Sequence, residues 1–193
     1  MITIGLTGSI GMGKTETAKC FARKGVVVFD SDLCVHKLLG PQGGAVDEVE
    51  HAFSGVQKED YIDRKILGAR VFGNDNSLEV LEKILHPLVV KERENFIKNA
   101  KADIILFDIP LLFENGYEND FDYIVVVSAS AEAQKKRVLE RSGMTKKRFK
   151  EILAKQSCNI NKAAMADFII QTDRGFDYAE KQVVDIIKQI RKY

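Results

Sequence analysis

The chain has 193 residues, 45% of them hydrophobic, and this size suits one domain with a sizeable core. Its 29 basic and 28 acidic residues give a formal net charge of +1, which excludes a global electrostatic attraction to nucleic acid or to an anionic membrane. The apolar runs are too short to span a bilayer, and a strand pattern begins at once without a targeting segment, so we expect a soluble cytoplasmic protein. The three cysteines lack CxxC or zinc-type spacing, so we expect free thiols.

A glycine-rich loop follows the first predicted strand, residues 2–6. Residues 8–15 spell Gly, four residues, then Gly-Lys-Thr, and a helical pattern comes next. Glycines let such a loop turn tightly and present its N–H groups to phosphates at a helix N-terminus. We expect Lys14 to reach the β- and γ-phosphates and the Thr15 hydroxyl to ligate magnesium. The predicted phosphate site comprises Gly8, Ser9, Ile10, Gly11, Met12, Gly13, Lys14 and Thr15.

The second predicted strand, residues 26–29, ends in two carboxylates, Asp30 and Asp32, on either side of Ser31. Ligands of open parallel sheets bind beyond the carboxyl ends of strands, so these carboxylates are candidates for a site beside the glycine-rich loop. Asp30 or Ser31 is equally suited to cap a helix that begins near Leu33. The pattern leaves both interpretations open.

Residues 33–100 have helical periodicity and no strand runs, which predicts a helical insertion. Ser77 is expected to cap a helix that follows it, and Pro87 to kink or restart that helix. Taken alone, His86 is typical of a packed or solvent-facing histidine.

The apolar run 102–107 predicts a buried strand that ends in Asp108. An acidic residue at the end of a hydrophobic strand, in a chain with a phosphate loop, is the Walker B arrangement that holds magnesium directly or through water. The alternative is an aspartate that opens a turn before Pro110.

A strand at 122–127 and a helix at 131–141 are predicted next, and a basic segment, residues 135–150, follows or overlaps that helix. The basic segment resembles a lid that closes over nucleotide phosphates, although most of its lysines fit a solvated helix face equally well. Arg137 and Arg141, four residues apart, are expected on one helical face and are the better candidates.

A last strand at 167–171 and a helix at 176–192 complete the chain, with Val183, Ile187 and Ile190 on one side of that helix. The alternation of strands and helices predicts an α/β fold. We expect a parallel five-stranded sheet covered on both faces, with the helical lobe inserted after the second strand.

Several short motifs also occur in a characteristic order over essentially the whole chain. They are Gly5-Leu6-Thr7-Gly8, Asp30-Ser31-Asp32, Ile62-Asp63-Arg64, Val71-Phe72, His86-Pro87, Asp108-Ile109-Pro110-Leu111-Leu112-Phe113-Glu114, Gln134, Arg137, Arg141, Gln156, Lys162 and Ala166-Asp167. Together they resemble the dephospho-CoA kinase family, whose members transfer the γ-phosphoryl group of ATP to the ribose 3′-hydroxyl of dephospho-CoA, the final step of coenzyme A biosynthesis.

The resemblance implies a P-loop NTPase three-layer sandwich, with residues 1–193 forming a single domain. Its core would be residues 1–32 and 101–193, its helical acceptor-binding insertion about 33–100, and its lid about 135–165. ATP and dephospho-CoA would be its small-molecule substrates and Mg²⁺ its cofactor. We expect a monomer.

The resemblance also assigns roles residue by residue. Asp32 would be the catalytic carboxylate facing the 3′-hydroxyl, Lys14 and Arg141 would supply positive charge, and Arg141 would contact ATP from the lid. Thr15 and Asp108 would hold the metal. The acceptor would contact Asp32, Arg64, His86, Leu111, Leu112, Phe113 and Glu114. The chain departs from the family at Thr172, where asparagine is usual, and at Met12, where a small residue is usual.

Three alternatives compete with this interpretation. A nucleoside monophosphate kinase would share the loop and the lid. A GTP-binding switch protein needs Asn-Lys-x-Asp and Asp-x-x-Gly motifs; here 161–164 lacks the final aspartate and Leu111 stands three residues after Asp108. A nucleic-acid-binding module lacks both the global charge and the interleaved aromatic residues.

Overall fold

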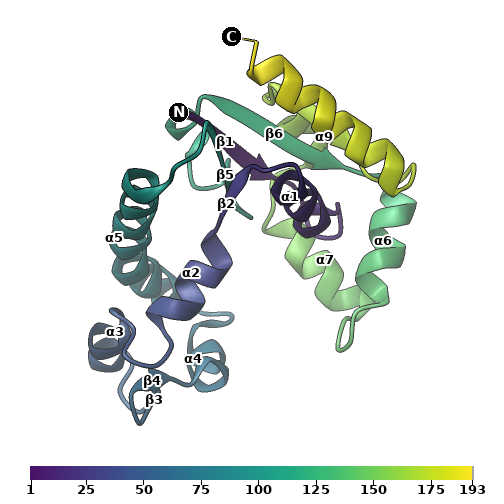
Figure 1. Ribbon diagram of the computed structural model, residues 1–193. Helices are drawn as coiled ribbons and strands as arrows, with labels where there is room; N and C mark the ends of the chain where they lie inside the picture. Colours follow the sequence, from purple (N-terminus) through teal and green to yellow (C-terminus); the bar gives the residue numbers. More distant parts are fainter. Residues whose placement is uncertain (193) are drawn as a thin grey trace. The chain divides into compact units, whose positions relative to one another are not determined.

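The computed structural model describes residues 1–192 (Figure 1). The chain divides into two compact units, one made of Met1–Val28 together with the chain from Lys101 onward, and the other of Phe29–Ala100. Each unit is described by itself below.

The first unit is built on a five-stranded sheet in the order β2-β5-β1-β6-β7. Strand β1 (Ile2–Thr7) pairs in parallel with β5 (Ile104–Asp108) and β6 (Tyr123–Ser128), and β6 pairs in parallel with β7 (Phe168–Gln171). Every residue of β5 is buried, as its continuous apolar run requires of a central parallel strand. The predicted five-stranded parallel sheet is confirmed.

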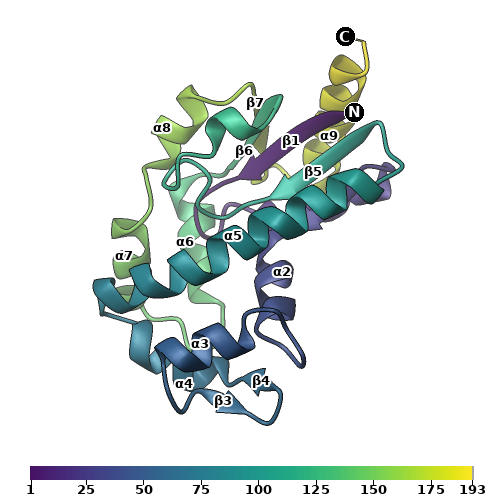
Figure 2. The same ribbon diagram turned by 90° about the vertical axis from the view of Figure 1, so that its left-hand side faces the viewer.

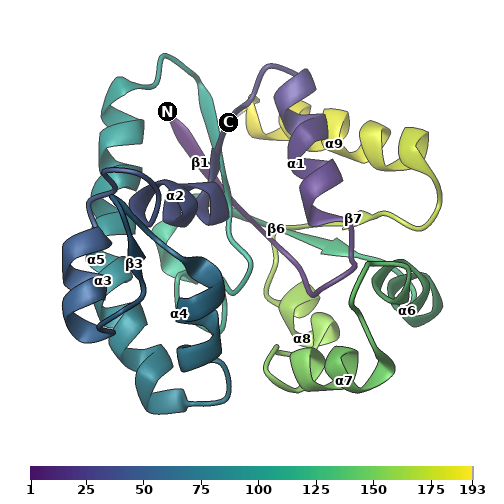
Figure 3. The ribbon, with the colours of Figure 1, turned by 90° about the horizontal axis from the view of Figure 1, so that it is seen from below.

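The helices of this unit are α1 (Lys14–Arg23), α6 (Ala131–Leu139), α7 (Lys146–Ala154), α8 (Asn159–Ala164) and α9 (Phe176–Ile190), with a short 3-10 turn at Glu118–Asp120. Helices α1 and α9 lie side by side (Figures 1 and 3). Their apolar faces join β1, β5 and β6 in one core, in which Val183, Ile187 and Ile190 are buried as predicted.

The second unit begins at the end of β2 (Val27–Asp30) and contains α2 (Ser31–Leu38), α3 (Val46–Ala52), α4 (Arg64–Val71) and α5 (Asp75–Asn99). Helices α2, α3 and α4 all pack against α5 (Figure 2). A two-stranded antiparallel hairpin, β3 (Gln57–Lys58) with β4 (Tyr61–Ile62), connects α3 to α4. The prediction that this region has no strand is wrong, because strands of two residues are too short to leave an alternating pattern.

Helix α5 begins and continues differently from the prediction. Its N-cap is Asn74, whose side chain accepts a hydrogen bond from Ser77 N at 3.1 Å, so Ser77 is inside the helix and the predicted cap is wrong. The helix also runs past the exposed Pro87 without restarting, since a long helix tolerates one missing backbone hydrogen bond. Although α5 has 25 residues, neither it nor any other helix of residues 1–192 is long and apolar enough to cross a bilayer.

Candidate active site

The glycine-rich loop connects β1 to α1 through two left-handed glycines. Gly11 has a φ of 78° and Gly13, the N-cap of α1, a φ of 97°. A Cβ at Gly11 would lie 2.5 Å from Val138 Cγ2, so no larger residue fits there. No side chain caps the first turn of α1, which leaves its N–H groups available to an anion.

Met12 anchors this loop in the core. Its side chain is buried among the residues that pack β1, α1 and α9, and Ala129 N lies 3.1 Å from its Sδ. This larger side chain therefore points inward and leaves the backbone of the loop open to a phosphate, as the sequence predicts. That orientation explains how the loop accommodates methionine where the related family usually has a small residue.

Polar side chains hold the first half of the loop by its peptide groups. Gln134 Nε2 donates to Ile10 O at 2.8 Å, and Ile10 N donates to Gln156 Oε1 at 3.0 Å. Ser9 N donates to Asn159 Oδ1 at 3.3 Å. Gln156 and Asn159 lie within the stretch expected to form the lid, 135–165, and Gln134 of α6 directly precedes it.

Arg137 and Thr172 hold the second half of the loop. Arg137 Nη1 donates to Thr172 Oγ1 at 2.9 Å and lies 3.4 Å from Gly11 O, while its Nη2 donates to Thr172 O at 2.7 Å. Thr172 Oγ1 in turn donates to Met12 O at 2.7 Å. Sequence reasoning grouped Arg137 with the lid and missed this supporting role, although its spacing from Gln134 places both on one face of α6.

Lys14 and Asp108 meet at the carboxyl end of the sheet. The register pairs Leu6 with Asp108, and Lys14 Nζ forms an ion pair with Asp108 Oδ1. Both side chains are mostly buried. The structure therefore brings together the lysine and the acidic residue that the motifs predicted to share a site. Thr15 follows them, exposed in the first turn of α1.

The loop Leu111–Glu114, predicted to contact the acceptor, is only partly accessible. Leu112 is fully buried, and a Cβ at Gly5 would lie 2.7 Å from its Cδ1, so this side chain presents no surface to a ligand. Glu114 turns toward the protein: Ser157 N donates to its Oε1 at 2.7 Å, and Lys162 Nζ lies 2.8 Å from the same oxygen. Leu111 and Phe113 are half-buried and remain open to a partner.

Arg141 lies beyond the end of α6. The helix ends at Leu139, before a turn in which Gly143 has a φ of 72°. Arg141 is exposed, whereas Arg137 is half-buried against the phosphate loop. The expectation that the two arginines share one helical face is therefore wrong, because the helix stops between them.

In the second unit, the two carboxylates after β2 have different roles. Asp30 is the N-cap of α2 and accepts from Leu33 N at 2.8 Å, as the capping interpretation predicts. Asp32 is exposed in the first turn of α2, and its carboxylate has no hydrogen bond or ion pair within residues 1–192. Its carboxylate is thus available to a ligand.

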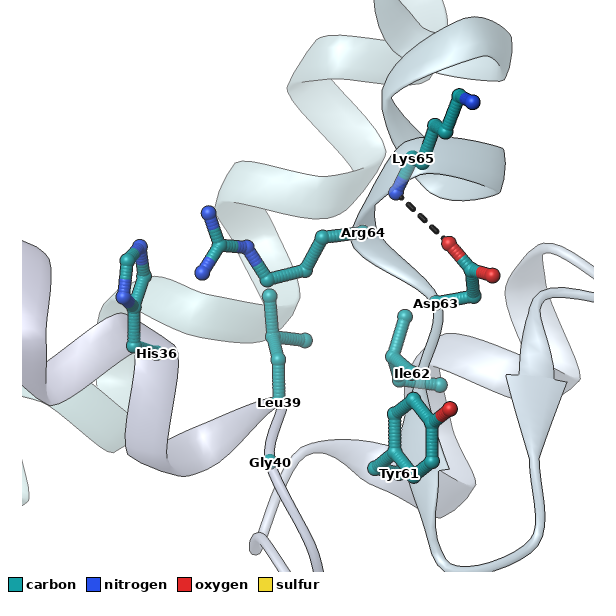
Figure 4. Close-up of a pocket in the computed structure, with 8 residues that line it drawn as sticks. All are labelled: His36, Leu39, Gly40, Tyr61, Ile62, Asp63, Arg64 and Lys65. Atoms are coloured by element: carbon teal, nitrogen blue, oxygen red, sulfur yellow. Dashed lines mark hydrogen bonds between the residues drawn. The ribbon is translucent and has the colours of Figure 1, made fainter.

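A cavity of about 430 Å³ lies in the same unit, with Arg64 and His36 on its wall. Figure 4 shows the guanidinium of Arg64 extending toward the ring of His36, while the side chain of Lys65 points away. Asp63 caps α4 through Lys65 N at 2.9 Å and pairs with Lys58, whose hydrogen bond holds the pKa of the Asp63 carboxyl below its usual range. Arg64 has no ion pair within the described chain, so its charge faces the cavity uncompensated.

His86 lies elsewhere on the second unit. It is an exposed residue of α5 and is not among the residues that line the cavity. The structure therefore places Arg64, but not His86, at the one cavity described for this unit within residues 1–192.

Comparison with known proteins identifies the family. A family model described as dephospho-CoA kinase matches residues 2–177. A curated dephospho-CoA kinase of Mesorhizobium japonicum is 47% identical over 194 residues, covering 99% of this chain and 98% of that protein. The solved dephospho-CoA kinase of Campylobacter jejuni is 28% identical with a TM-score of 0.66, and a Thermus thermophilus protein is 26% identical with a TM-score of 0.87; each alignment covers 97% of this chain and 96% of the other. The chain belongs to the dephospho-CoA kinase family of P-loop kinases.

Proposed function

We propose that the protein transfers the γ-phosphoryl group of ATP to the ribose 3′-hydroxyl of dephospho-CoA, with coenzyme A and ADP as products. The observation that carries the proposal is the ion pair of Lys14 with Asp108 beside a glycine-rich loop, in a chain that matches this family over residues 2–177. A nucleoside monophosphate kinase is not favoured, because the matching family model and relatives are dephospho-CoA kinases over nearly the whole chain.

ATP is proposed to bind with its phosphates in the loop Gly8–Thr15. The uncapped N-terminus of α1 and the N–H groups of the loop provide fixed dipoles for the phosphate charge. Arg141, exposed at the end of α6, is proposed to contact the phosphates when the lid, residues 135–165, closes.

Magnesium is the metal that the site fits. The Thr15 hydroxyl and the Asp108 carboxylate offer the hard oxygen ligands that this ion prefers. Thr15 lies in the first turn of α1, and Asp108 is the last residue of β5. When bound, the ion neutralises charge on the phosphate oxygens.

The acceptor is proposed to use the second unit. The Arg64 guanidinium can bind a phosphate of the acceptor's diphosphate through two parallel hydrogen bonds, and the cavity beside it accommodates part of an elongated substrate. Asp32 is proposed to accept a hydrogen bond from the 3′-hydroxyl, to orient that hydroxyl for in-line attack and to take its proton late in the transfer. His86, Leu111 and Phe113 remain proposed acceptor contacts.

A coupled assay of ADP release tests the proposal. The wild-type protein is mixed with Mg-ATP and dephospho-CoA, and AMP, adenosine and no acceptor are the controls. We expect turnover only with dephospho-CoA, with coenzyme A identified as the product by mass. Preference for AMP would overturn the substrate assignment, and the absence of turnover with every acceptor would overturn the kinase assignment.

The remaining proposals concern the setting of the enzyme. We propose that it works as a monomer in the cytoplasm. The balanced charge and the three cysteines without disulfides, Cys20, Cys34 and Cys158, support that location.

A further inference from the structure

Lys162 is a fully buried lysine, which is rare in proteins unless the charge is paired. Its Nζ lies 2.8 Å from Glu114 Oε1, yet the ammonium makes no hydrogen bond of good geometry. Glu114 Oε2 is also buried and has no hydrogen-bond partner within residues 1–192. Because buried polar atoms of native proteins are usually satisfied, the pair is costly to keep and calls for a role beyond packing.

The chain just before Lys162 contacts two loops of the first unit. Gln156 and Asn159 accept hydrogen bonds from Ile10 N and Ser9 N of the phosphate loop. Between them, Ser157 N donates to Glu114 of the Leu111–Glu114 loop at 2.7 Å. We call residues 156–162 the bridge segment, because it connects the loop for the phosphates to the loop expected to contact the acceptor.

The bridge segment is also fixed to the sheet. Asn159 Nδ2 donates to Ser128 Oγ at 3.1 Å and lies 3.4 Å from Val127 O, and α8 packs on β6 (Figure 2). The bridge segment meets the Leu111–Glu114 loop at Glu114, whose carboxylate contacts both Ser157 and Lys162. One carboxylate therefore links the segment that holds the phosphate loop to the loop on the acceptor side.

We propose that Lys162 is a positioning residue that couples the Leu111–Glu114 loop to the phosphate loop. The ammonium holds the Glu114 carboxylate against the bridge segment, so a nucleotide that orders the phosphate loop also orders the loop on the acceptor side. By thermodynamic linkage, the acceptor then binds more tightly to the nucleotide complex, and the nucleotide more tightly to the acceptor complex. The effects on dephospho-CoA turnover depend on the proposed function, whereas the coupling between the two loops does not.

The kinetic test compares Lys162→Met, Lys162→Arg and the control Lys188→Met, which makes the same change at an exposed lysine of α9, outside the lid. We expect Lys162→Met to lower kcat/KM for dephospho-CoA by about 10²-fold, since small displacements of positioning groups have effects of that size. The Kd of ADP without acceptor should stay within about twofold of wild type. Lys162→Arg should recover most of the loss, and Lys188→Met should behave as wild type.

Hydrogen–deuterium exchange supplies a readout that does not depend on turnover. In the wild type, saturating ADP should slow amide exchange in residues 8–15 and also in residues 111–117. In Lys162→Met the first effect should persist and the second should vanish. If Lys162→Met does not fold, Glu114→Gln replaces it, because the amide keeps an oxygen for Ser157 N and removes the charge that Lys162 pairs with.

The outcomes separate this inference from the proposed function. Retention of the exchange response at 111–117 in a folded Lys162 or Glu114 variant would overturn the coupling, as would a variant with wild-type kcat and KM for both substrates. A different result is that Lys162→Met weakens ADP binding and kcat/KM for dephospho-CoA equally, with no recovery in Lys162→Arg. That result would make Lys162 a structural residue and would overturn the inference as well. A wild type inactive on dephospho-CoA would overturn the proposed function and leave the exchange test intact.

Discussion

Replacing Thr172 by valine removes one hydroxyl from the support of the phosphate loop and keeps the shape of the side chain. That hydroxyl donates to Met12 O at 2.7 Å and accepts from Arg137 Nη1 at 2.9 Å. Thr172→Val leaves Met12 O without this donor and leaves Arg137 with its bond to the Thr172 carbonyl. Since valine is also favoured in strands and their ends, the variant isolates the hydrogen bonds.

The magnitude follows from these two contacts. The bond to Met12 O is a neutral hydrogen bond. The bond from Arg137 Nη1 involves a charge, but Arg137 Nη2 keeps its own bond to the Thr172 carbonyl. Together the two bonds of the hydroxyl are expected to contribute about 2 kcal/mol to the free energy of unfolding. For a protein of this size, that corresponds to a fall in Tm of about 4–8 °C. Because the loop loses its support at the start of α1, the KM for ATP should rise while the KM for dephospho-CoA changes less.

Thermal unfolding followed by circular dichroism, at one protein concentration and without nucleotide, measures the stability change. Thr172→Ser is the matched control, because serine keeps the hydroxyl and should stay close to the wild type. A Thr172→Val protein that melts within about 1 °C of wild type, with an unchanged KM for ATP, would refute the reasoning. That result would mean that the hydroxyl does not support the loop.

The remaining predictions address the chemistry and the helical unit. Asp32→Asn should lower kcat strongly with little change in the KM for ATP, because the proposed role of this exposed carboxylate is to orient the acceptor hydroxyl. A near-normal kcat in steady-state assays would remove Asp32 from the mechanism. Lys14→Ala should abolish phosphoryl transfer, because it removes the ammonium expected to reach the phosphates, and assays of ADP release and of nucleotide binding can check this. The backbone N–H groups of Gly55, Gln57 and Val56 donate to Glu50 and hold the pKa of its carboxyl below the usual value. These hydrogen bonds therefore stabilise the fold fully above about pH 4.3, and their contribution is lost as the pH falls through the lowered pKa. Melting curves at pH 6 and about pH 3 should therefore show a smaller acid-induced fall in Tm for Glu50→Gln than for wild type, and equal falls would contradict this.

Features with a strong local pattern could be predicted from the sequence. The apolar run of β5 and the one-sided spacing of Val183, Ile187 and Ile190 in α9 each identify an element that the structure confirms. The glycine-rich loop and Asp108 can also be identified from the sequence, because each follows a strand of a parallel sheet, and the ion pair of Lys14 with Asp108 shows that they meet. Local choices between equivalent residues were harder: Asn74 and Ser77 are both good caps, and only the backbone decides between them.

Contacts between distant residues could not be predicted in this way. Thr172 lies 160 residues from Met12, and nothing in the local pattern indicates that its hydroxyl reaches the phosphate loop. Lys162 has the appearance of a solvated lysine in a polar segment, yet tertiary packing buries it completely against Glu114. The burial of Leu112 depends likewise on the close approach that Gly5 permits.

The ion pair of Lys14 with Asp108 has a consequence for which anions the protein selects. A ligand that brings only negative charge competes with the mostly buried Asp108 carboxylate for Lys14, and this competition opposes its binding. On the proposed function, a phosphate chain with its own divalent cation would offer a partner to each member of the pair, the ion to Asp108 and the phosphates to Lys14. We therefore expect the protein to prefer the metal complex of the nucleotide over free inorganic phosphate and over metal-free nucleotide.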